Sequence, residues 1–350
     1  MILREYPFGQ VECFSDMIAC AWDQVHDEML PIMSLYNDPD VTDIMVNRYD
    51  NIWKVVGGKP YQTPYSFGSE NSLKSFAAQI ATVLKQPYST TGNYKLDDLI
   101  EPILDARFPD GSRIMATDNI ISPQGTTISL RKVPKRFLTQ DDFLKSEMFN
   151  EEMLSYLIDV IKQRKTFLTS GNTGSGKTSL LRFLANYIDK LERVITVEDT
   201  QELHIQKLFP LGIAMEAAHR KDVNATLPQL VNATMRAQPD RVWVGEVRTA
   251  QALAAFYLTC TSGTTGNATT MHSFDVRGAF KKLQWLISSE LNVGYEVAGD
   301  LVKEEIEVVV QCRRSPVFGR KITEIVEVRN GILTPIFLYD EKTNSHHCCV

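Results

Sequence analysis

The chain has 350 residues, a length that suits two domains of ordinary size better than one small domain. Its 37 basic and 43 acidic residues give a formal net charge of −6, and 43% of the residues are hydrophobic and 23% charged. This mix is that of a globular protein and excludes a disordered or fibrous chain. The acidic pI near 5.6 argues against a protein that works mainly by gripping nucleic acid through a basic face, although a local basic patch can exist under a negative total.

The chain is expected to be soluble and intracellular. Its N-terminus reaches Tyr6-Pro7 before any apolar core of signal-peptide length, and no apolar stretch is long enough to span a bilayer. Four scattered cysteines lack the spacing of zinc or redox motifs and are expected to be reduced, buried and inert: Cys13, Cys20, Cys260 and Cys312. The C-terminal His346-His347-Cys348-Cys349 could ligate a metal, but adjacent ligands without a second cluster close no site, so a frayed tail is the expectation.

The first 135 residues predict a compact α+β domain. A nearly helical repeat of apolar residues over Phe14–Tyr36 predicts a helix that Pro31 bends or ends, and Glu70–Lys85 predicts an amphipathic helix stopped before Pro87. Short apolar runs bounded by turn residues predict five strands, over Asp43–Asn47, Asn51–Val56, Ile103–Phe108, Arg113–Asn119 and Thr126–Arg131.

A composition shift near Val133–Arg136 indicates a linker, after which helices and strands alternate over residues 136–350. Helices are predicted at Glu151–Arg164, Thr178–Lys190 and Ala250–Leu258, and strands at Lys165–Ser170, Arg193–Val197 and Arg241–Val244. The strands are short apolar runs of the kind buried inside a parallel sheet. Such alternation predicts an α/β fold with a mostly parallel sheet and right-handed crossovers.

A phosphate-binding loop is the strongest motif in the chain. Residues 171–178 match G-x-x-x-x-G-K-[ST] at every fixed position, with a predicted strand before them and a predicted helix after them. Glycines let successive backbone N–H groups turn toward phosphate oxygens, and the start of the helix adds its positive dipole end. Lys177 would reach the β- and γ-phosphates and Thr178 would offer its hydroxyl to Mg²⁺. The alternative, a glycine-rich surface turn, requires a chance match to four fixed positions.

The nucleotide-binding residues expected from this motif are Gly171, Asn172, Thr173, Gly174, Ser175, Gly176, Lys177, Thr178 and Ser179.

Two further predicted strands end in carboxylates. One runs into Glu198-Asp199 and the other into Gly245-Glu246. The carboxyl ends of parallel strands lie along the same crevice as the phosphate loop, so these charges would sit beside Mg²⁺ and the attacking water. The alternative is that they cap helices or solvate loops. Spacing does not settle which glutamate is the base and which serves the metal shell.

A stretch rich in small hydroxyl residues, Thr261–His272, follows the predicted helix at Ala250–Leu258. In a nucleotide-binding sheet, His272 at its end could sense the γ-phosphate by hydrogen bonding. A lone histidine is also a common structural residue, and that alternative stays open on the residues alone.

The order of these motifs resembles the secretion ATPases of type II and type IV secretion, pilus and conjugal-transfer systems. That family has a phosphate loop, an "Asp box" (here Ile195–Leu203), a variant second Walker motif (Pro239–Arg248) and a "His box" (Thr269–His272). Similarity extends upstream to Asp38–Asn47 and Phe108–Arg113, and downstream to Ile306–Gln311 and Thr323–Val328. The chain is most similar to the conjugal-transfer and tight-adherence pilus branch.

The resemblance implies an N-terminal α+β, PAS-like domain over residues 1–135 and a RecA-like ATPase domain over 136–350. It implies that Glu198 is the general base, that Glu246 lies near Mg²⁺, and that His272 faces the nucleotide or a neighbouring subunit. Family members form hexameric rings in which N-terminal arginines approach the phosphates, and Arg113 and Arg131 stand where these arginines would be. The role of Arg107 stays open.

The resemblance therefore implies a cytoplasmic, homohexameric motor that binds ATP and Mg²⁺ and drives a secretion, conjugation or pilus machine. Its partners would be components of that machine at the inner membrane, which would hold the motor there, and no direct nucleic-acid binding is expected. The alternative is a nucleic-acid translocase or helicase of RecA-like type, and a third possibility is a nucleotide-gated scaffold that does not hydrolyse ATP. The sequence does not identify the machine, its substrate, its docking partners or the direction of the motor.

Overall fold

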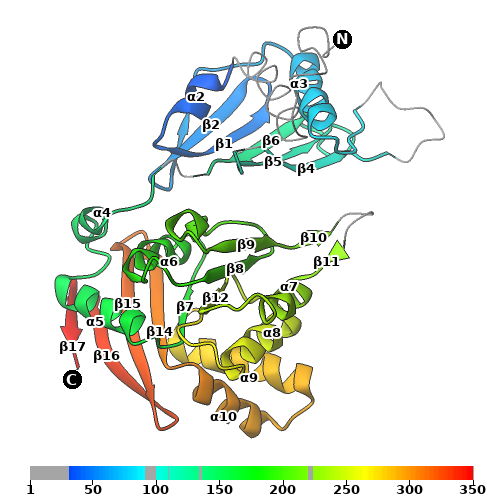
Figure 1. The fold of residues 1–350 in the computed structure, drawn as a ribbon. Helices are drawn as coiled ribbons and strands as arrows, with labels where there is room; N and C mark the ends of the chain where they lie inside the picture. The colour runs from blue at the N-terminus through cyan, green and yellow to red at the C-terminus, as the bar shows by residue number, and fades with distance from the viewer. Residues whose placement is uncertain (1–30, 91–99, 109, 134–135, 220–223, 350) are drawn as a thin grey trace. The chain divides into compact units, whose positions relative to one another are not determined.

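The computed structural model of the chain describes residues 31–90, 100–108, 110–133, 136–219 and 224–349 (Figure 1). The chain divides into two compact units, Met1–Arg136 and Phe137–Val350. Residues 14–30 of the first predicted helix lie outside the described residues, and of the remainder only Met33–Asn37 (α2) is helical. Within the described residues, no helix combines the length and the apolarity needed to cross a bilayer.

The N-terminal unit is built on a six-stranded antiparallel sheet with the strand order β3-β2-β1-β6-β5-β4. The strands are β1 Val41–Arg48, β2 Asn51–Val56, β3 Lys59–Gln62, β4 Ile103–Arg107, β5 Arg113–Thr117 and β6 Thr127–Arg131. Sequence patterning indicated all of these except β3, which is exposed along its whole length and carries no apolar repeat.

One face of this sheet holds the core of the unit. Alternate residues of the strands, such as Ile44, Ile114 and Leu130, are buried with Leu35 of α2 and Phe76 of α3 (Glu70–Val83). Ser69 is the N-cap of helix α3, and its hydroxyl accepts a hydrogen bond from the backbone N–H of Ser72. This bond gives a partner to one of the N–H groups that the first turn of a helix leaves unpaired. The opposite face of the sheet carries the intervening residues, which are exposed or partly exposed among the described residues.

The C-terminal unit contains a nine-stranded sheet in the order β17-β16-β15-β14-β7-β13-β12-β8-β9. The six strands from β14 to β9 are parallel to their neighbours, and β15, β16 and β17 add an antiparallel edge. The bounds are β7 Phe167–Gly171, β8 Val194–Glu198, β9 Ile213–Glu216, β12 Arg241–Val244, β13 Ala268–Met271, β14 Val308–Ser315, β15 Gly319–Arg329, β16 Ile332–Asp340 and β17 Ser345–Cys348. A small ribbon, β10 Ala218–His219 with β11 Asn224–Ala225, lies apart from the sheet.

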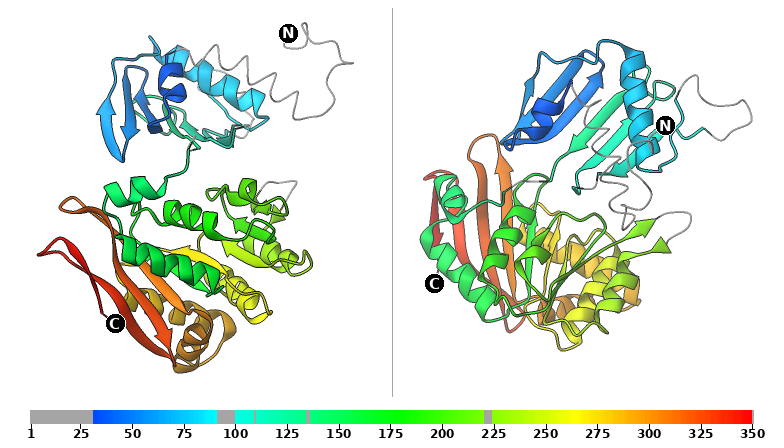
Figure 2. Two further views of the ribbon diagram at one scale, coloured as in Figure 1. Left: turned by 60° about the vertical axis from the view of Figure 1, so that its left-hand side comes forward. Right: turned by 45° about the horizontal axis from the view of Figure 1, so that its top comes forward.

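Helices cover both faces of this sheet, as Figure 2 shows. On one face, Phe167 and Trp243 pack with Leu157 of α5 (Glu151–Lys162) and Leu181 of α6 (Lys177–Leu184). The other face packs against α7 Leu227–Thr234, α8 Ala250–Thr261, α9 Val276–Leu291 and α10 Tyr295–Glu305. A short helix, α4 Gln140–Lys145, precedes α5. Coverage on both faces explains why the central strands β7, β8, β12 and β13 are buried at every residue.

Two predictions were wrong in this unit. The helix after the phosphate loop ends at Leu184 and continues only as a 3₁₀ turn at Ala185–Tyr187, because the amide of Asn186 donates to Phe183 O and competes with helical hydrogen bonding.

The C-terminal tail is also ordered where fraying was expected. β17 pairs antiparallel with β16. Asn344 fixes the turn between them: its φ is +51°, and its side-chain oxygen accepts a hydrogen bond from the hydroxyl of Tyr339. His346 lies 3.0 Å from Ile322 O through Nε2, and burial lowers the pKa of its imidazole. Among the described residues, no group of three or more His, Cys, Asp or Glu side chains could hold a metal ion.

Candidate nucleotide site

The phosphate loop leaves β7 and enters α6, as the motif predicts. At Gly171 a Cβ would lie 1.9 Å from Cys312 O of β14, so only glycine lets the two strands approach this closely. Gly176 caps the helix with a φ of +98°, a left-handed conformation that other residues adopt only with strain. These glycines bring the N–H groups at the start of α6 into the arrangement that binds anions.

Lys177 lies folded back into this loop. Its ammonium donates to Gly171 O at 2.9 Å and Asn172 O at 3.3 Å, and it lies 3.3 Å from His272 Nδ1. The side chain is 7% exposed, and burial lowers its pKa, while the nearby charge of Glu246 acts in the opposite direction. A buried ammonium that is held only by neutral carbonyl oxygens binds an anion more strongly, so a phosphate can displace these carbonyl oxygens.

His272 and Glu246 are brought beside the loop by neighbouring strands, since β13 lies between β7 and β12. Nε2 of His272 is 3.1 Å from Glu246 Oε1, and Glu246 Oε2 accepts from Arg248 at 2.7 Å. Nδ1 of His272 also lies 3.1 Å from Gly171 O, so the ring stands between the phosphate loop, the ammonium of Lys177 and the carboxylate of Glu246. The structure thus brings together three of the residues that the sequence selected from three separate motifs.

Glu198 ends β8 and is 2% exposed. Its Oε1 accepts the backbone N–H groups of Glu202 and Leu203, each at 3.0 Å, while Oε2 has no hydrogen-bond partner among the described residues. Burial raises the pKa of this carboxyl to about 7, against the lowering effect of the two N–H groups. Gly245 packs directly on it, because a Cβ there would lie 2.7 Å from Glu198 Cγ.

Glu202 is a site residue that the pattern of strand ends does not reveal. Its Oε2 accepts from the hydroxyl of Thr178 at 3.4 Å, and its carbonyl oxygen accepts from the guanidinium of Arg182 in α6. The signal available in the sequence was its place four residues after Glu198, within the Asp box. It adds a carboxylate beside the hydroxyl expected to face Mg²⁺.

The β14–β15 hairpin forms the other wall of the loop, and sequence reasoning did not identify it. The side chain of Asn172 donates to Arg314 O at 3.1 Å and accepts from Arg314 N at 2.9 Å. Arg320 donates from Nε to Gly174 O at 2.8 Å. These contacts join residues more than 140 positions apart.

The residues present fit a magnesium nucleotide. A hydroxyl and carboxylates, from Thr178, Glu202 and Glu246, are the hard oxygen ligands that Mg²⁺ prefers. Ser175 Oγ in the loop and Glu198 Oε2 are buried without a hydrogen-bond partner among the described residues, so the loop retains polar capacity for a ligand.

Three arginines of the N-terminal unit, Arg107, Arg113 and Arg131, lie in one row on the face of its sheet opposite the core. Strand pairing places Asp43 opposite Arg131, Arg131 opposite Arg113, and Arg113 opposite Arg107. Arg113 pairs with Asp105 at 2.8 Å and Arg131 with Asp43 at 3.1 Å. A groove of about 430 Å³ on this face is lined by both Arg113 and Arg131. The register adds Arg107 to the same row.

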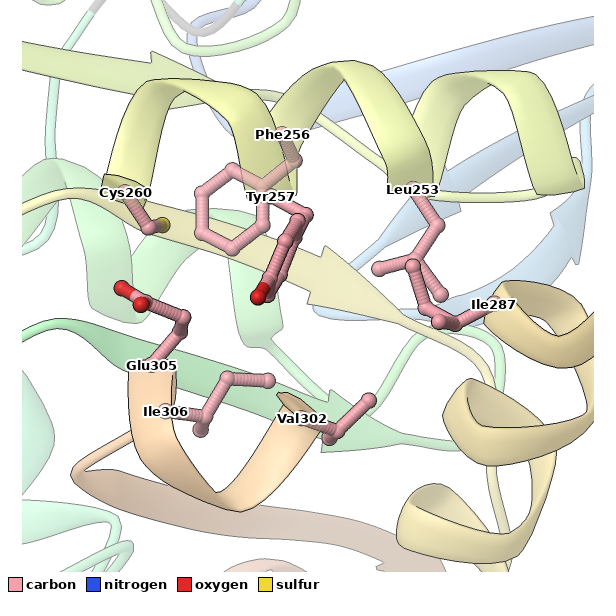
Figure 3. Close-up of a pocket in the computed structure, with 8 residues that line it drawn as sticks. All are labelled: Leu253, Phe256, Tyr257, Cys260, Ile287, Val302, Glu305 and Ile306. Carbon is pink, nitrogen blue, oxygen red and sulfur yellow. The ribbon is translucent and has the colours of Figure 1, made fainter. Parts of the chain in front are cut away.

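A second, small cavity is lined by none of the residues of the nucleotide site. Figure 3 shows side chains that converge on it from α8, α9 and the end of α10. They are Leu253, Phe256, Tyr257, Cys260, Ile287, Val302, Glu305 and Ile306. Its volume of about 10 Å³ is room for about one water molecule.

Of the four cysteines expected to be buried, Cys312 is buried and Cys260 is partly buried. Burial raises the pKa of each of these two thiols to about 12. Cys13 and Cys20 lie outside the described residues.

The fold and the site together define a P-loop nucleotide-binding protein with a mixed α/β architecture. The chain belongs to the family described as "Type II/IV secretion system protein", whose model matches residues 25–329. Membership of this family and the phosphate loop make the chain a secretion-system ATPase, and the predicted family and activity are confirmed.

Similar proteins include members of conjugal-transfer systems. The chain is 31% identical over 225 residues to "Uncharacterized protein MJ0781" of Methanocaldococcus jannaschii, covering 62% of this chain and 30% of that protein. It is 25% identical over 341 residues to "Type IV secretion system protein VirB11" of Bartonella quintana, covering 84% of this chain and 90% of that protein. It is 28% identical over 232 residues to "Conjugal transfer protein TrbB" of Rhizobium radiobacter, covering 65% of this chain and 68% of that protein.

Among solved structures, the fold is similar to that of the ATPase DotB of Legionella pneumophila. The TM-score is 0.59 at 17% identity, covering 94% of this chain and 84% of that one. The mixed α/β fold predicted from the sequence agrees with this likeness.

Proposed function

We propose that this chain is a homohexameric ATPase motor that hydrolyses ATP to drive a type IV secretion, conjugation or related pilus machine from the cytoplasmic face of the inner membrane. The supporting observation is the contact of Lys177 with His272 and of His272 with Glu246, at 3.3 and 3.1 Å. Three separate motifs meet there beside one phosphate loop. The similarity to VirB11 and TrbB proteins supports a machine of this class.

Within this function, we assign ATP to the loop formed by Gly171–Ser179, with Lys177 on the β- and γ-phosphates. Thr178 and Glu246 would hold Mg²⁺, which supplies neutralisation of the charge that develops on the phosphates. Glu198 would take a proton from the attacking water. A carboxyl with a pKa raised to about 7 suits that task, because a base near neutrality is both ionised and able to hold the proton.

His272 would report on the γ-phosphate, because it touches Lys177 on one side of its ring and Glu246 on the other. A phosphate that recruits the ammonium would leave Nδ1 beside Gly171 O alone, and the ring would transmit this change to Glu246.

Residues 1–135 and 136–350 would be a PAS-like domain and a RecA-like domain. The N-terminal domain would present Arg113 and Arg131 to the phosphates within the ring. Their guanidiniums are exposed and pair with the exposed Asp105 and the partly buried Asp43, and ion pairs this open to solvent are weak. A polyphosphate is a stronger, bidentate partner, so these arginines could exchange from carboxylate to nucleotide.

The experiment is ATP turnover by the full chain, measured with the oligomer sized under the same conditions. Lys177→Ala should abolish ATP binding, and Glu198→Gln should bind ATP without hydrolysing it. Hydrolysis unchanged in Glu198→Gln would overturn the assignment of the base and favour another carboxylate. Turnover stimulated by DNA with a steep salt dependence would instead support a nucleic-acid translocase.

A further inference from the structure

We propose that the β14–β15 hairpin is part of the nucleotide site and that Arg320 is a positioning residue for the phosphate loop. This inference rests on the proposed function, since it gives Arg320 a role in binding the polyphosphate of ATP. Arg320 would hold the loop in its anion-binding conformation and place a positive charge beside the phosphates.

The loop is attached to the hairpin at three successive points. Gly171 ends β7 against Cys312 O, in the last pair of the β7–β14 ladder. Asn172 extends that ladder with its side chain, which makes two hydrogen bonds to the backbone of Arg314. Gly174 O then accepts from Arg320 Nε at 2.8 Å. The first two contacts fix the start of the loop at Gly171 and Asn172, and the third fixes its middle at Gly174.

The third contact decides which way one peptide of the loop faces. Gly174 has a φ of +70°, and a glycine can change its peptide orientation at little cost. In a trans peptide the C=O and the following N–H point in opposite directions. Holding Gly174 O toward Arg320 therefore turns the N–H of Ser175 the opposite way, where it donates to Asn172 O at 3.2 Å, a hydrogen bond that a bound anion would replace.

The charges around Gly174 also favour an anion. Arg314 Nη1 lies 3.1 Å from the position that a Cβ on Gly174 would occupy, so two guanidiniums flank the same residue. Burial and the like charge of Arg314 lower the pKa of Arg320, which means that its environment opposes a second positive charge. An anionic polyphosphate in the loop would relieve this repulsion. A purely structural arginine gains nothing from such an arrangement.

The alternative is that Arg320 only fastens the hairpin to the loop. The two roles are separated by comparing Arg320→Gln, which removes the charge, with Arg320→Lys, which keeps it. Arg329→Gln is the matched control, because Arg329 lies at the other end of β15 and pairs with Glu327 at 2.7 Å. Each variant of the full chain is titrated with a fluorescent ATP analogue and a fluorescent ADP analogue, and its KM, kcat and thermal midpoint are measured.

We expect Arg320→Gln to raise the Kd for both nucleotides and the KM for ATP by about tenfold, with a smaller change in kcat. Arg320→Lys should recover part of that loss, and Arg329→Gln should bind like the wild type. Should Arg320→Gln not fold, Arg320→Met, which keeps the apolar stem, takes its place. Wild-type affinity in the charge-removing variant, or an equal loss in Arg329→Gln, would overturn the proposal. Because nucleotide binding is read without turnover, a wild-type chain that binds ATP but does not hydrolyse it would defeat the proposed function and leave this test intact.

Discussion

Replacing the buried carboxyl of Glu198 by an amide should stabilise the nucleotide-free ATPase unit at the same time as it removes hydrolysis. The pKa of this carboxyl is raised from 4.5 to about 7 by burial. The folded state therefore binds the proton more tightly than the unfolded state, so the free energy of unfolding falls as the pH rises from 4.5 to about 7. At about 1.4 kcal/mol per pKa unit, the ionised carboxylate costs the folded state about 3 kcal/mol above that window.

Glu198→Gln removes this cost and keeps most of the local bonding. The amide oxygen can accept from the N–H groups of Glu202 and Leu203, as Oε1 does at 3.0 Å. Its NH₂ group would replace Oε2, which has no hydrogen-bond partner among the described residues, and burying that group offsets about 1–2 kcal/mol of the gain. We therefore expect a net gain of about 1–2 kcal/mol above pH 7, or roughly 2–8 °C in the unfolding midpoint of a unit of this size.

The assay is thermal unfolding of the wild type and Glu198→Gln without nucleotide, at a pH near 5 and a pH near 8. The gain should be present at the higher pH and disappear at the lower one, where the wild-type carboxyl is protonated. Asp199→Asn, which removes an exposed carboxylate one residue away, should show no such pattern. A gain that is equal at both pH values, or absent at the higher one, would show that Glu198 ionises like an ordinary surface carboxylate.

Two glycines give further predictions. Gly266→Ala should lower the thermal midpoint of the ATPase unit by several degrees, because its Cβ would lie 2.3 Å from Arg241 Nη1, in a buried guanidinium bound to Glu192 at 2.7 Å. Gly263→Ala is the control: it has the same left-handed backbone and nothing within 4 Å, so an equal loss in both would refute the clash. Gly245→Ala should abolish hydrolysis while ATP binding persists, because it displaces Glu198, and retained turnover would contradict this contact. Gly294→Ala, with open space around it, should leave turnover unchanged.

The parts of the site carried by parallel strands could be predicted from the sequence. Glu198 and Glu246 lie at the ends of short apolar strands, and His272 closes a hydroxyl-rich stretch, so each could be selected from its own motif. The carboxyl ends of parallel strands then bring them to the same edge of the sheet. The spacing of the loop itself identified Lys177 and Thr178. These inferences needed only local pattern and the rule that parallel strands end on one side.

The hairpin wall of the site could not be predicted in this way. Arg320 meets Gly174 only because β14 pairs with β7 and β15 folds back on β14, two pairings between segments far apart in the chain. An arginine after a turn is ordinary in sequence, and nothing local marks it as a neighbour of the loop. The tail was mispredicted for a similar reason: the stability of β17 comes from pairing with β16, which its own residues do not reveal.

The charged groups at the loop contact one another in series. Lys177 is held by Gly171 O and faces His272, which also faces Glu246, which in turn is paired with Arg248. A phosphate that drew the ammonium away would change the surroundings of His272, which contacts Glu246 directly. On the proposed function, binding of ATP and the orientation of Glu246, the carboxylate assigned to Mg²⁺, are therefore coupled through His272. A ring of such subunits could pass this change on only if bound nucleotide sets the position of Glu246.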